Sequence, residues 1–338
     1  MSQIIAIIGA TGNQGSSVAH TFLNAPNWTV RAITRNPAST KARALAAAGA
    51  ELFQADLNDI ASLEAAFQGV HSIFVNTDFW GPYLSGTGTG GETTRHSDDA
   101  FNEEVNHGKN AAIAASRVPT LERFVYSALG PMKRASKGKY AQSYHWDSKA
   151  TIVDYIKREQ PELAKKTSFI YIGVYATNPL FVPKPDPEAG FYKFILPMRG
   201  ETKIPIIDTP SSTGPFVHAL VEHEPAGTNL LAYDSYLSLD EVVDIWAKSM
   251  GKQAELVTVT AEHMHAEFNI PWEVLQAPLW IDEAGYMGGI DEWIGPADLK
   301  VRPRTKTFGE WLAGRDWEGV LDGGHADLQS LKEPGRSA

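Results

Sequence analysis

The sequence predicts an α/β protein with a Rossmann-like, doubly wound parallel sheet and a smaller C-terminal α/β domain. Segments of strand and helix character alternate along residues 1–178, which is typical of a parallel sheet covered by helices. The first strand also ends in a turn with glycines at a fixed spacing. We therefore expect a Rossmann domain over residues 1–178 with contributions from later segments, a smaller domain over 179–322, and a weakly ordered tail over 323–338.

The glycine-spaced turn follows the apolar run at residues 4–8 and precedes a helical pattern that starts near Val18. Gly9 lets the backbone turn, Gly12 removes the side chain where a phosphate approaches, and Gly15 lets the helix pack against the strand. The N–H groups at the start of the helix can then bind a pyrophosphate. The alternative is a tight turn without a ligand.

The next strand, at residues 29–37, indicates which dinucleotide binds. NAD sites place an acidic residue at the end of this strand to bind the ribose 2′-hydroxyl. Here no Asp or Glu occurs, and Arg35 stands at the strand end. A guanidinium suits a 2′-phosphate, so the sequence favours NADP, with NAD possible. Lys41 or Arg43 could assist, and the alternative is a solvated arginine.

The remaining elements of the first domain follow from apolar periodicity and turn residues. The predicted helices span residues 40–48, 60–67 (with Asp59 as N-cap), 101–116 and 144–159. The predicted strands span residues 51–54, 71–76, 123–126 and 168–174. Residues 81–99 and 131–138 are expected to be loops, the first a lid or an insertion without a role, the second a basic patch.

Prolines break the alternation after residue 178. Short strands are expected at residues 204–207, 230–233 and 256–259, and helices at 239–250 and 307–312. Five tryptophans fall in this part, Trp272, Trp280, Trp293, Trp311 and Trp317. They predict a second small core, with an apolar substrate pocket as the alternative.

Composition excludes several classes of function. The 338 residues carry a formal net charge of −10, which argues against direct binding of nucleic acid or an anionic membrane. The absence of cysteine excludes disulfides and thiolate catalysis. No basic segment precedes the first apolar run, which is too short for a signal or membrane segment, so we expect a cytoplasmic or nuclear location.

Ordered motifs along the chain carry a family resemblance. They are Gly9–Gly15 (GATGNQG), the VRAITRNP segment at 30–37, QAD at 54–56, NTDFW at 76–80, HWDSK at 145–149, VYATN at 174–178 and TFGEWL at 307–312. Together they resemble the NmrA-like branch of the atypical short-chain dehydrogenases/reductases. The resemblance implies a Rossmann domain with a smaller C-terminal domain, and NAD(P) binding. Some members of this branch are enzymes, and others are redox sensors or transcriptional co-regulators.

The resemblance also implies cofactor contacts. The pyrophosphate would lie on Gly9, Ala10, Thr11, Gly12, Asn13 and Gln14, with Gly15 completing the glycine motif. Arg35 would bind the 2′-phosphate, and Asp56 and Leu57 would flank the adenine. Thr77, Asp78 and Phe79 would line the path to the nicotinamide, Lys149 would bind its ribose, and Tyr175 and Asn178 would close over that end.

Catalysis in the parent group uses a Tyr four residues before a Lys on one helix, so that both side chains share a face. The position four before Lys149 is His145, while Tyr144 points about 140° away on an ideal helix. His145 is either a proton donor or a ring that packs over the cofactor. Ser127, at a strand end, either polarises a carbonyl or is an ordinary strand-end serine.

Two classes of function remain. One is an NADP(H)-dependent oxidoreductase acting on a small carbonyl, enone or aromatic compound. The other is a non-catalytic cofactor sensor that binds a regulatory protein partner. No metal site is predicted, because the two-residue spacing of His263 and His265 separates their rings on a helix. The acidic residues Asp98, Asp99, Glu103 and Glu104 are expected to form a solvated face.

Overall fold

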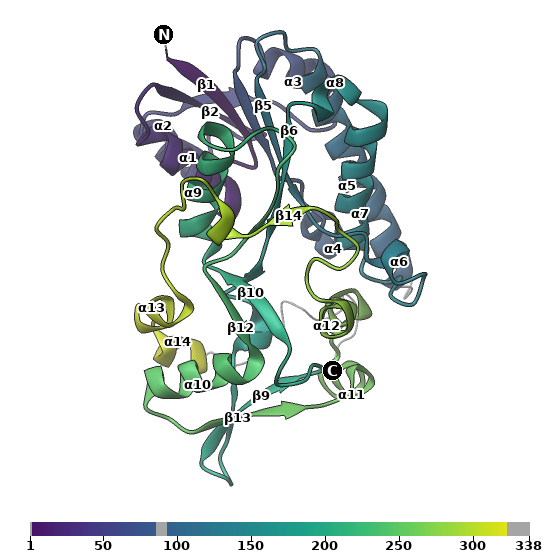
Figure 1. Cartoon of the computed structure of the whole chain (residues 1–338), viewed down its shortest axis with the longest axis vertical. Helices are drawn as coiled ribbons and strands as arrows, with labels where there is room; N and C mark the ends of the chain where they lie inside the picture. The colour runs from purple at the N-terminus through teal and green to yellow at the C-terminus, as the bar shows by residue number, and fades with distance from the viewer. Residues whose placement is uncertain (1, 86–92, 323–338) are drawn as a thin grey trace.

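The computed structural model describes residues 2–85 and 93–322, and its largest element is an eight-stranded sheet (Figure 1). From edge to edge the strands are β14 (Trp293–Ile294), β11 (Asn229–Ala232), β6 (Thr167–Ile172), β5 (Arg123–Ala128), β4 (Ser72–Val75), β1 (Gln3–Ile8), β2 (Trp28–Thr34) and β3 (Glu51–Gln54). Every pairing in this sheet is parallel. The strand order reverses between β1 and β4, which is where such sheets bind ligands. The predicted fold class is confirmed.

Helices cover both faces of the sheet (Figure 1). One face carries α1 (Asn13–Leu23), α2 (Thr40–Ala47) and α9 (Thr209–Glu222), and the other α3 (Ile60–Ala66), α5 (Thr93–Ser116), α7 (Tyr144–Glu159) and α8 (Pro161–Ala164). β1 is buried on both faces of the sheet, which explains why its sequence is apolar throughout. Ile5 and Ile7 are buried in the core cluster on the α1 side, whereas Ala6 and Ile8 belong to the cluster on the α5 side. As predicted, Asp59 caps α3, accepting backbone N–H groups at 3.0 and 3.3 Å.

A second lobe lies beyond the carboxyl ends of the strands (Figure 1). Its two three-stranded sheets are β12 (Ser235–Ser238), β10 (Lys203–Ile207) and β7 (Val174–Tyr175), and β13 (Ala254–Thr258), β9 (Phe191–Leu196) and β8 (Lys184–Asp186). Its helices are α10 (Leu239–Met250), α11 (Ala261–Phe268), α12 (Trp272–Ala284), α13 (Phe308–Ala313) and α14 (Trp317–Asp322). This part of the chain also contains two short 3₁₀ helices, η1 (Pro179–Phe181) and η2 (Pro296–Asp298). Trp246 packs against Phe194 and Trp317 in the core of this lobe.

The predicted strand at 168–174 is in fact two strands. β6 belongs to the large sheet and ends at Ile172, while β7 pairs with β10 in the second lobe. The break falls at Gly173, where an added Cβ would lie 2.7 Å from the carbonyl oxygen of Pro205. Close approach of another backbone explains why glycine stands where the chain crosses between the lobes.

After residue 178 the chain returns to the large sheet and forms α9 on one of its faces (Figure 1). This helix was not predicted. Its sequence contains two prolines and Gly214, which are ordinarily turn residues. The first proline stands at the helix start, where no backbone N–H is needed, while Pro215 lies inside the helix. Gly214 lets α9 approach α1, and its N–H donates to the Ser17 hydroxyl at 2.9 Å.

Both expected loops contain helix, so these two predictions were wrong. Within 81–99, the short helix α4 (Trp80–Ser85) covers the start and α5 begins at Thr93; residues 86–92 lie outside the described residues. Phe79 and Tyr83 pack against Ala100, and this contact replaces the missing apolar periodicity. Within 131–138, the chain forms the short helix α6 (Met132–Ala135), and the side chain of Met132 is buried.

The predicted tail at 323–338 also lies outside the described residues. No helix in the described part of the chain is long and apolar enough to cross a membrane.

Candidate active site

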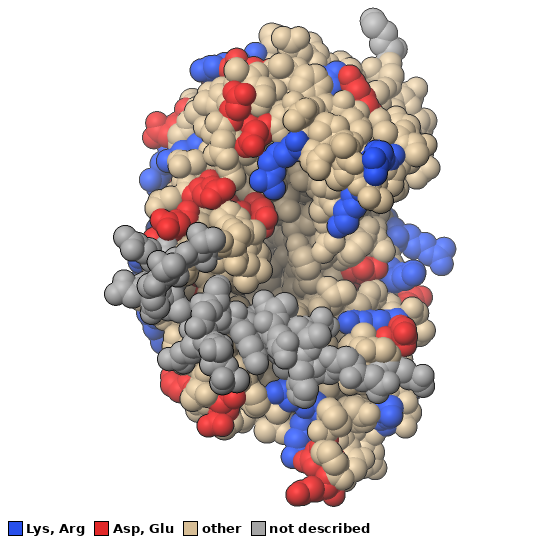
Figure 2. Space-filling model, turned by 180° about the vertical axis from the view of Figure 1, so that it is seen from behind, with Lys and Arg blue, Asp and Glu red and all other residues tan. Residues whose placement is uncertain are grey.

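A cavity of about 1150 Å³ lies between the carboxyl ends of the large sheet's strands and the second lobe. Figure 2 shows a hollow in the middle of the molecule, with basic and acidic side chains on its upper rim. The predicted site residues that line the cavity are Gly9, Thr11, Gly12, Asn13, Gln14, Arg35, Asp56, Leu57, Thr77, Asp78, Phe79, Ser127, His145, Lys149, Tyr175 and Asn178. Ala10 and Gly15 do not line it, because both are buried beneath the loop.

The glycine loop has the shape expected of a phosphate cradle. Gly9 adopts a φ of 75°, and the N–H of Gly12 closes the turn on the Gly9 carbonyl at 2.9 Å. A Cβ on Gly15 would lie 2.2 Å from the Gly9 carbonyl oxygen, so helix and loop touch directly. α1 has no side-chain cap at its start, which leaves its first N–H groups available to an anion.

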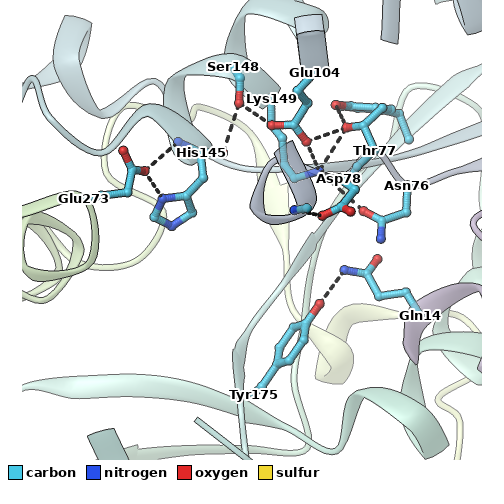
Figure 3. A network of polar contacts seen from close by, with 12 residues as sticks. Gln14, Asn76, Thr77, Asp78, Glu104, His145, Ser148, Lys149, Tyr175 and Glu273 are labelled. Atoms are coloured by element: carbon cyan, nitrogen blue, oxygen red, sulfur yellow. Dashed lines mark hydrogen bonds and ion pairs between the residues drawn. The ribbon is translucent and has the colours of Figure 1, made fainter. Parts of the chain in front are cut away.

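Gln14 joins this loop to the second lobe. Its amide nitrogen donates to the Tyr175 hydroxyl at 2.9 Å (Figure 3). Its Oε1 is buried and has no hydrogen-bond partner among the described residues. Burial raises the pKa of Tyr175, so the hydroxyl stays protonated. Asn178, three residues on, accepts the N–H of Leu180 at 2.9 Å and starts η1. The two residues therefore border the cavity from the lobe opposite the loop.

At the far end of the cavity from the second lobe, Arg35 is exposed and Asp56 is half-buried. Neither Lys41 nor Arg43 lines the cavity, so Arg35 is the cation of this end. Sequence reasoning missed His107 of α5, which also lines it. The imidazole is buried, and within residues 2–85 and 93–322 its Nε2 finds no hydrogen-bond partner. Burial lowers the pKa of this imidazole.

Lys149 of α7 is held by a buried carboxylate. Its Nζ lies 2.9 Å from Oε1 of Glu104 and 3.1 Å from both oxygens of Thr77 (Figure 3). Glu104 is 0% exposed and also accepts the hydroxyls of Thr77 and Ser148. Burial raises the pKa of Tyr126, which lies 3.1 Å from the Thr77 hydroxyl, well above its usual range, and the charge of Glu104 adds to this. The ammonium is thus fixed at the cavity wall.

The prediction that the acidic residues form a solvated face was wrong for Glu104. Asp98, Asp99 and Glu103 are exposed, but Glu104 points into the core from the opposite face of α5. The signal in the sequence was its helical register: residue 104 shares a face with Ala100, Ala111 and Ala115, which are buried.

His145 stands one turn before Lys149 and borders the same cavity. Its Nδ1 lies 2.6 Å from Oε1 of Glu273, the second residue of α12, and its ring packs against Trp80 at 4.9 Å and Phe79 at 5.9 Å. Among the described residues its Nε2 makes no hydrogen bond. Tyr144 does not line the cavity, and its ring meets Phe101 edge-on. Ser127 is buried and lines the cavity from the end of β5.

An apolar compartment extends the cavity beyond His145. One face of α12 supplies Val274, Ala277, Pro278 and Ile281, and η1 supplies Leu180 and Phe181. The α12 residues follow the i, i+3, i+4, i+7 spacing of a helix face, a signal present in the sequence. Tyr286 closes the compartment, and its hydroxyl donates to the carbonyl of Ile172. None of the side chains named here carries a charge.

The five tryptophans of the C-terminal part do not line the cavity. Trp280 and Trp317 are buried in the core, as the predicted second core requires. Trp293 does not fit that prediction, because it is 40% exposed and lies in β14 of the large sheet. In the described part of the chain, no group of three or more His, Cys, Asp or Glu residues could hold a metal.

Comparisons with known proteins support the fold and the family. The NmrA-like family model matches residues 1–312. An NmrA-like family domain-containing oxidoreductase, himF of Aspergillus japonicus, is 30% identical over 271 residues, covering 77% of this chain and 76% of that protein.

Two solved structures are similar in fold. NmrA, a negative transcriptional regulator solved with NADP, has a TM-score of 0.68 and 19% identity, covering 97% of this chain and 99% of that one. The NADPH-dependent quinone oxidoreductase QOR2 from Escherichia coli, solved with NADPH, has a TM-score of 0.65 and 22% identity, covering 91% and 98%. These two likenesses concern the fold. The match over residues 1–312 shows that the chain belongs to the NmrA-like family, as its motifs predicted.

Proposed function

We propose that the protein is an NADPH-dependent oxidoreductase that reduces an uncharged carbonyl compound, such as an enone, a quinone or an aromatic ketone. One observation carries the proposal: a single cavity joins the glycine loop, the His145 and Lys149 side chains and an apolar compartment. Its volume of about 1150 Å³ exceeds the roughly 300–1,000 Å³ typical of a pocket for one drug-sized ligand. The cavity therefore suits a dinucleotide and a substrate together.

The loop fits a dinucleotide on three counts. A Cβ has no room at Gly15, so α1 starts close to the strand end, as a pyrophosphate site requires. The start of α1 is uncapped. The buried Oε1 of Gln14 has no partner and can accept a hydrogen bond from a bound group, which removes the cost of leaving it unsatisfied.

Arg35 is expected to set the preference for NADPH. Its guanidinium borders the cavity, and the strand before it carries no acid to bind a ribose hydroxyl. Arg35→Ala should weaken NADPH binding by roughly 1.5–3 kcal/mol, the contribution of a charge-assisted hydrogen bond, and leave NADH binding nearly unchanged. Isothermal titration calorimetry with both cofactors measures this.

The matched control for this experiment is Arg43→Ala, which removes an exposed cation of α2 outside the cavity. Equal affinity of the wild-type protein for NADH and NADPH would show that Arg35 does not meet a 2′-phosphate.

The protein's own residues would place the carbonyl group and supply a proton. When bound, NADPH supplies a hydride. As the imidazolium, His145 would give the proton on Nε2 to the carbonyl oxygen of the substrate, and water would restore that proton. The hydroxyl of Ser127 donates a hydrogen bond to the same oxygen. Lys149 binds the ribose hydroxyls, since the i, i+4 spacing puts it on the same face of α7 as His145.

The apolar compartment restricts the substrate. Burying a charged group among Val274, Ala277 and Ile281 would carry a large desolvation cost without a counter-charge. A flat, uncharged ring system with one carbonyl oxygen near Nε2 of His145 would contact both the apolar wall and this polar atom beside it.

A redox sensor is the second candidate. His145 in place of the parent group's tyrosine favours it, as does the likeness to NmrA, a transcriptional regulator. NADPH oxidation with a panel of quinones, enones and aromatic ketones distinguishes the two. Turnover supports the enzyme. A partner protein that binds differently with NADP⁺ and NADPH, without turnover of any compound, supports the sensor.

A further inference from the structure

Glu273 is a buried acid of the second lobe that touches the start of α7. It is 3% exposed. Its Oε2 accepts the backbone N–H of Tyr144 at 3.1 Å, and its Oε1 accepts the backbone N–H of His145 at 2.9 Å. No side chain of α7's own segment caps this helix, so an acid from α12 satisfies its first N–H groups.

The same carboxylate also contacts the imidazole of His145. Oε1 lies 2.6 Å from Nδ1 (Figure 3). A carboxylate accepts hydrogen bonds and has no hydrogen to donate, so the hydrogen of this third contact sits on Nδ1. The neutral ring is therefore the Nδ1–H tautomer, and Nε2 is the nitrogen left to exchange a proton with a ligand.

The ring cannot turn away from this arrangement without losing contacts on two sides. Glu273 holds one edge, and Trp80 and Phe79 pack against the ring at 4.9 and 5.9 Å. Val274, the next residue of α12, begins the wall of the apolar compartment. One helix thus fixes the imidazole and shapes the space beside it.

We infer that Glu273 is a positioning residue for the proton-donating imidazole: it binds Nδ1 and leaves Nε2 for a ligand. The inference rests on the proposed function, because it needs His145 to be the proton donor. Capping alone requires only the two backbone contacts. The third contact, to Nδ1, fixes the tautomer and the orientation of the ring.

Other charged groups also face His145. Asp147, on α7 itself, interacts with its charge, and burial raises the pKa of Asp147 to about 6. Lys149, one turn on, is neutralised by Glu104 of α5. The residues packed on the ring from α4 and its preceding segment are aromatic. Glu273 is the acid with a hydrogen bond to the ring.

Glu273→Gln keeps an oxygen that can accept from Nδ1 but removes the charge. We expect kcat for reduction of 1,4-naphthoquinone by NADPH to fall about 10–100-fold, since one charge-assisted hydrogen bond is lost, with little change in KM.

The matched control is Glu283→Gln. Glu283 lies on the same helix, α12, and binds Tyr140 at 2.6 Å and Lys139, just before α7. It also ties α12 to the Rossmann lobe, yet it is outside the cavity. If the two variants change kcat and KM alike, Glu273 only joins the lobes and the inference is overturned.

A second measurement does not depend on turnover or on the variant folding. ¹⁵N–¹H NMR of the wild-type imidazoles, with the His145 signals assigned from their loss in His145→Phe, reports which nitrogen carries the hydrogen. The inference predicts the Nδ1–H tautomer at high pH. An Nε2–H tautomer overturns it, even if NADPH reduces the quinone. An Nδ1–H tautomer with no turnover of any carbonyl compound leaves Glu273's positioning of the ring intact and refutes the proposed function instead.

Discussion

His145→Phe is expected to reduce turnover by about 10²–10⁴-fold, the usual contribution of a general acid, while NADPH binding persists. The phenyl ring keeps the packing against Trp80 and Phe79, and Lys149 keeps its contacts with Glu104. What is lost is the proton that Nε2 delivers. The rate is followed by the loss of NADPH absorbance, and binding is followed by calorimetry.

Tyr144→Phe is the control for this experiment. Tyr144 precedes His145, but its ring packs on Phe101 and does not line the cavity. Its removal should leave turnover nearly unchanged. If Tyr144→Phe abolishes turnover and His145→Phe does not, the hydroxyl of the neighbouring residue is the acid, and the geometry of α7 in the working enzyme differs from that seen here.

Glu104→Ala should destabilise the fold by roughly 3–5 kcal/mol, the cost of breaking a buried ion pair by removing one partner. Glu104 is 0% exposed and accepts from Lys149, Thr77 and Ser148. Its loss leaves an ammonium without a counter-charge and removes the carboxylate that accepts two hydroxyls. Urea denaturation followed by circular dichroism gives the change in the free energy of unfolding.

Glu103→Ala is the control, because it removes an exposed carboxylate from the same helix, α5. Glu103 is exposed and approaches His107 only at 3.8 Å, so its removal should change stability by no more than about 0.5 kcal/mol. Combining Glu104→Ala with Lys149→Ala should cost less than the sum of the single changes, because no unpaired charge remains. Equal effects of Glu103→Ala and Glu104→Ala would contradict the ion pair.

The fold and the end of the cavity at the glycine loop and Arg35 could be predicted because their signals are local. The glycine spacing that ends at Gly15 specifies a turn that only residues without a side chain can form. Asp59 marks the start of α3, because its carboxylate caps the first N–H groups of that helix. The position of Arg35 at the end of β2 could be predicted, because the residues on either side of it show where the strand ends.

The partners of His145 and Lys149 could not be predicted, because the contacts are long-range. Glu104 is 45 positions from Lys149, and Glu273 is 128 positions from His145. The spacing on α7 fixes which side chains share a face, but not which acid meets them. Helix α9 was missed for a different reason. Its prolines and Gly214 are turn residues locally, and the packing of Gly214 against Ser17 overrides that preference.

In the proposed enzyme, one cavity brings the nicotinamide and a carbonyl compound together beside His145. The experiment incubates NADPH deuterated at the transferred position of C4 with the wild-type protein and the panel of quinones, enones and aromatic ketones. We expect oxidation of NADPH with at least one uncharged compound, and deuterium on carbon in enone or ketone products. NADPH that binds tightly and remains unoxidised with every compound would show that the cavity does not reduce a carbonyl compound.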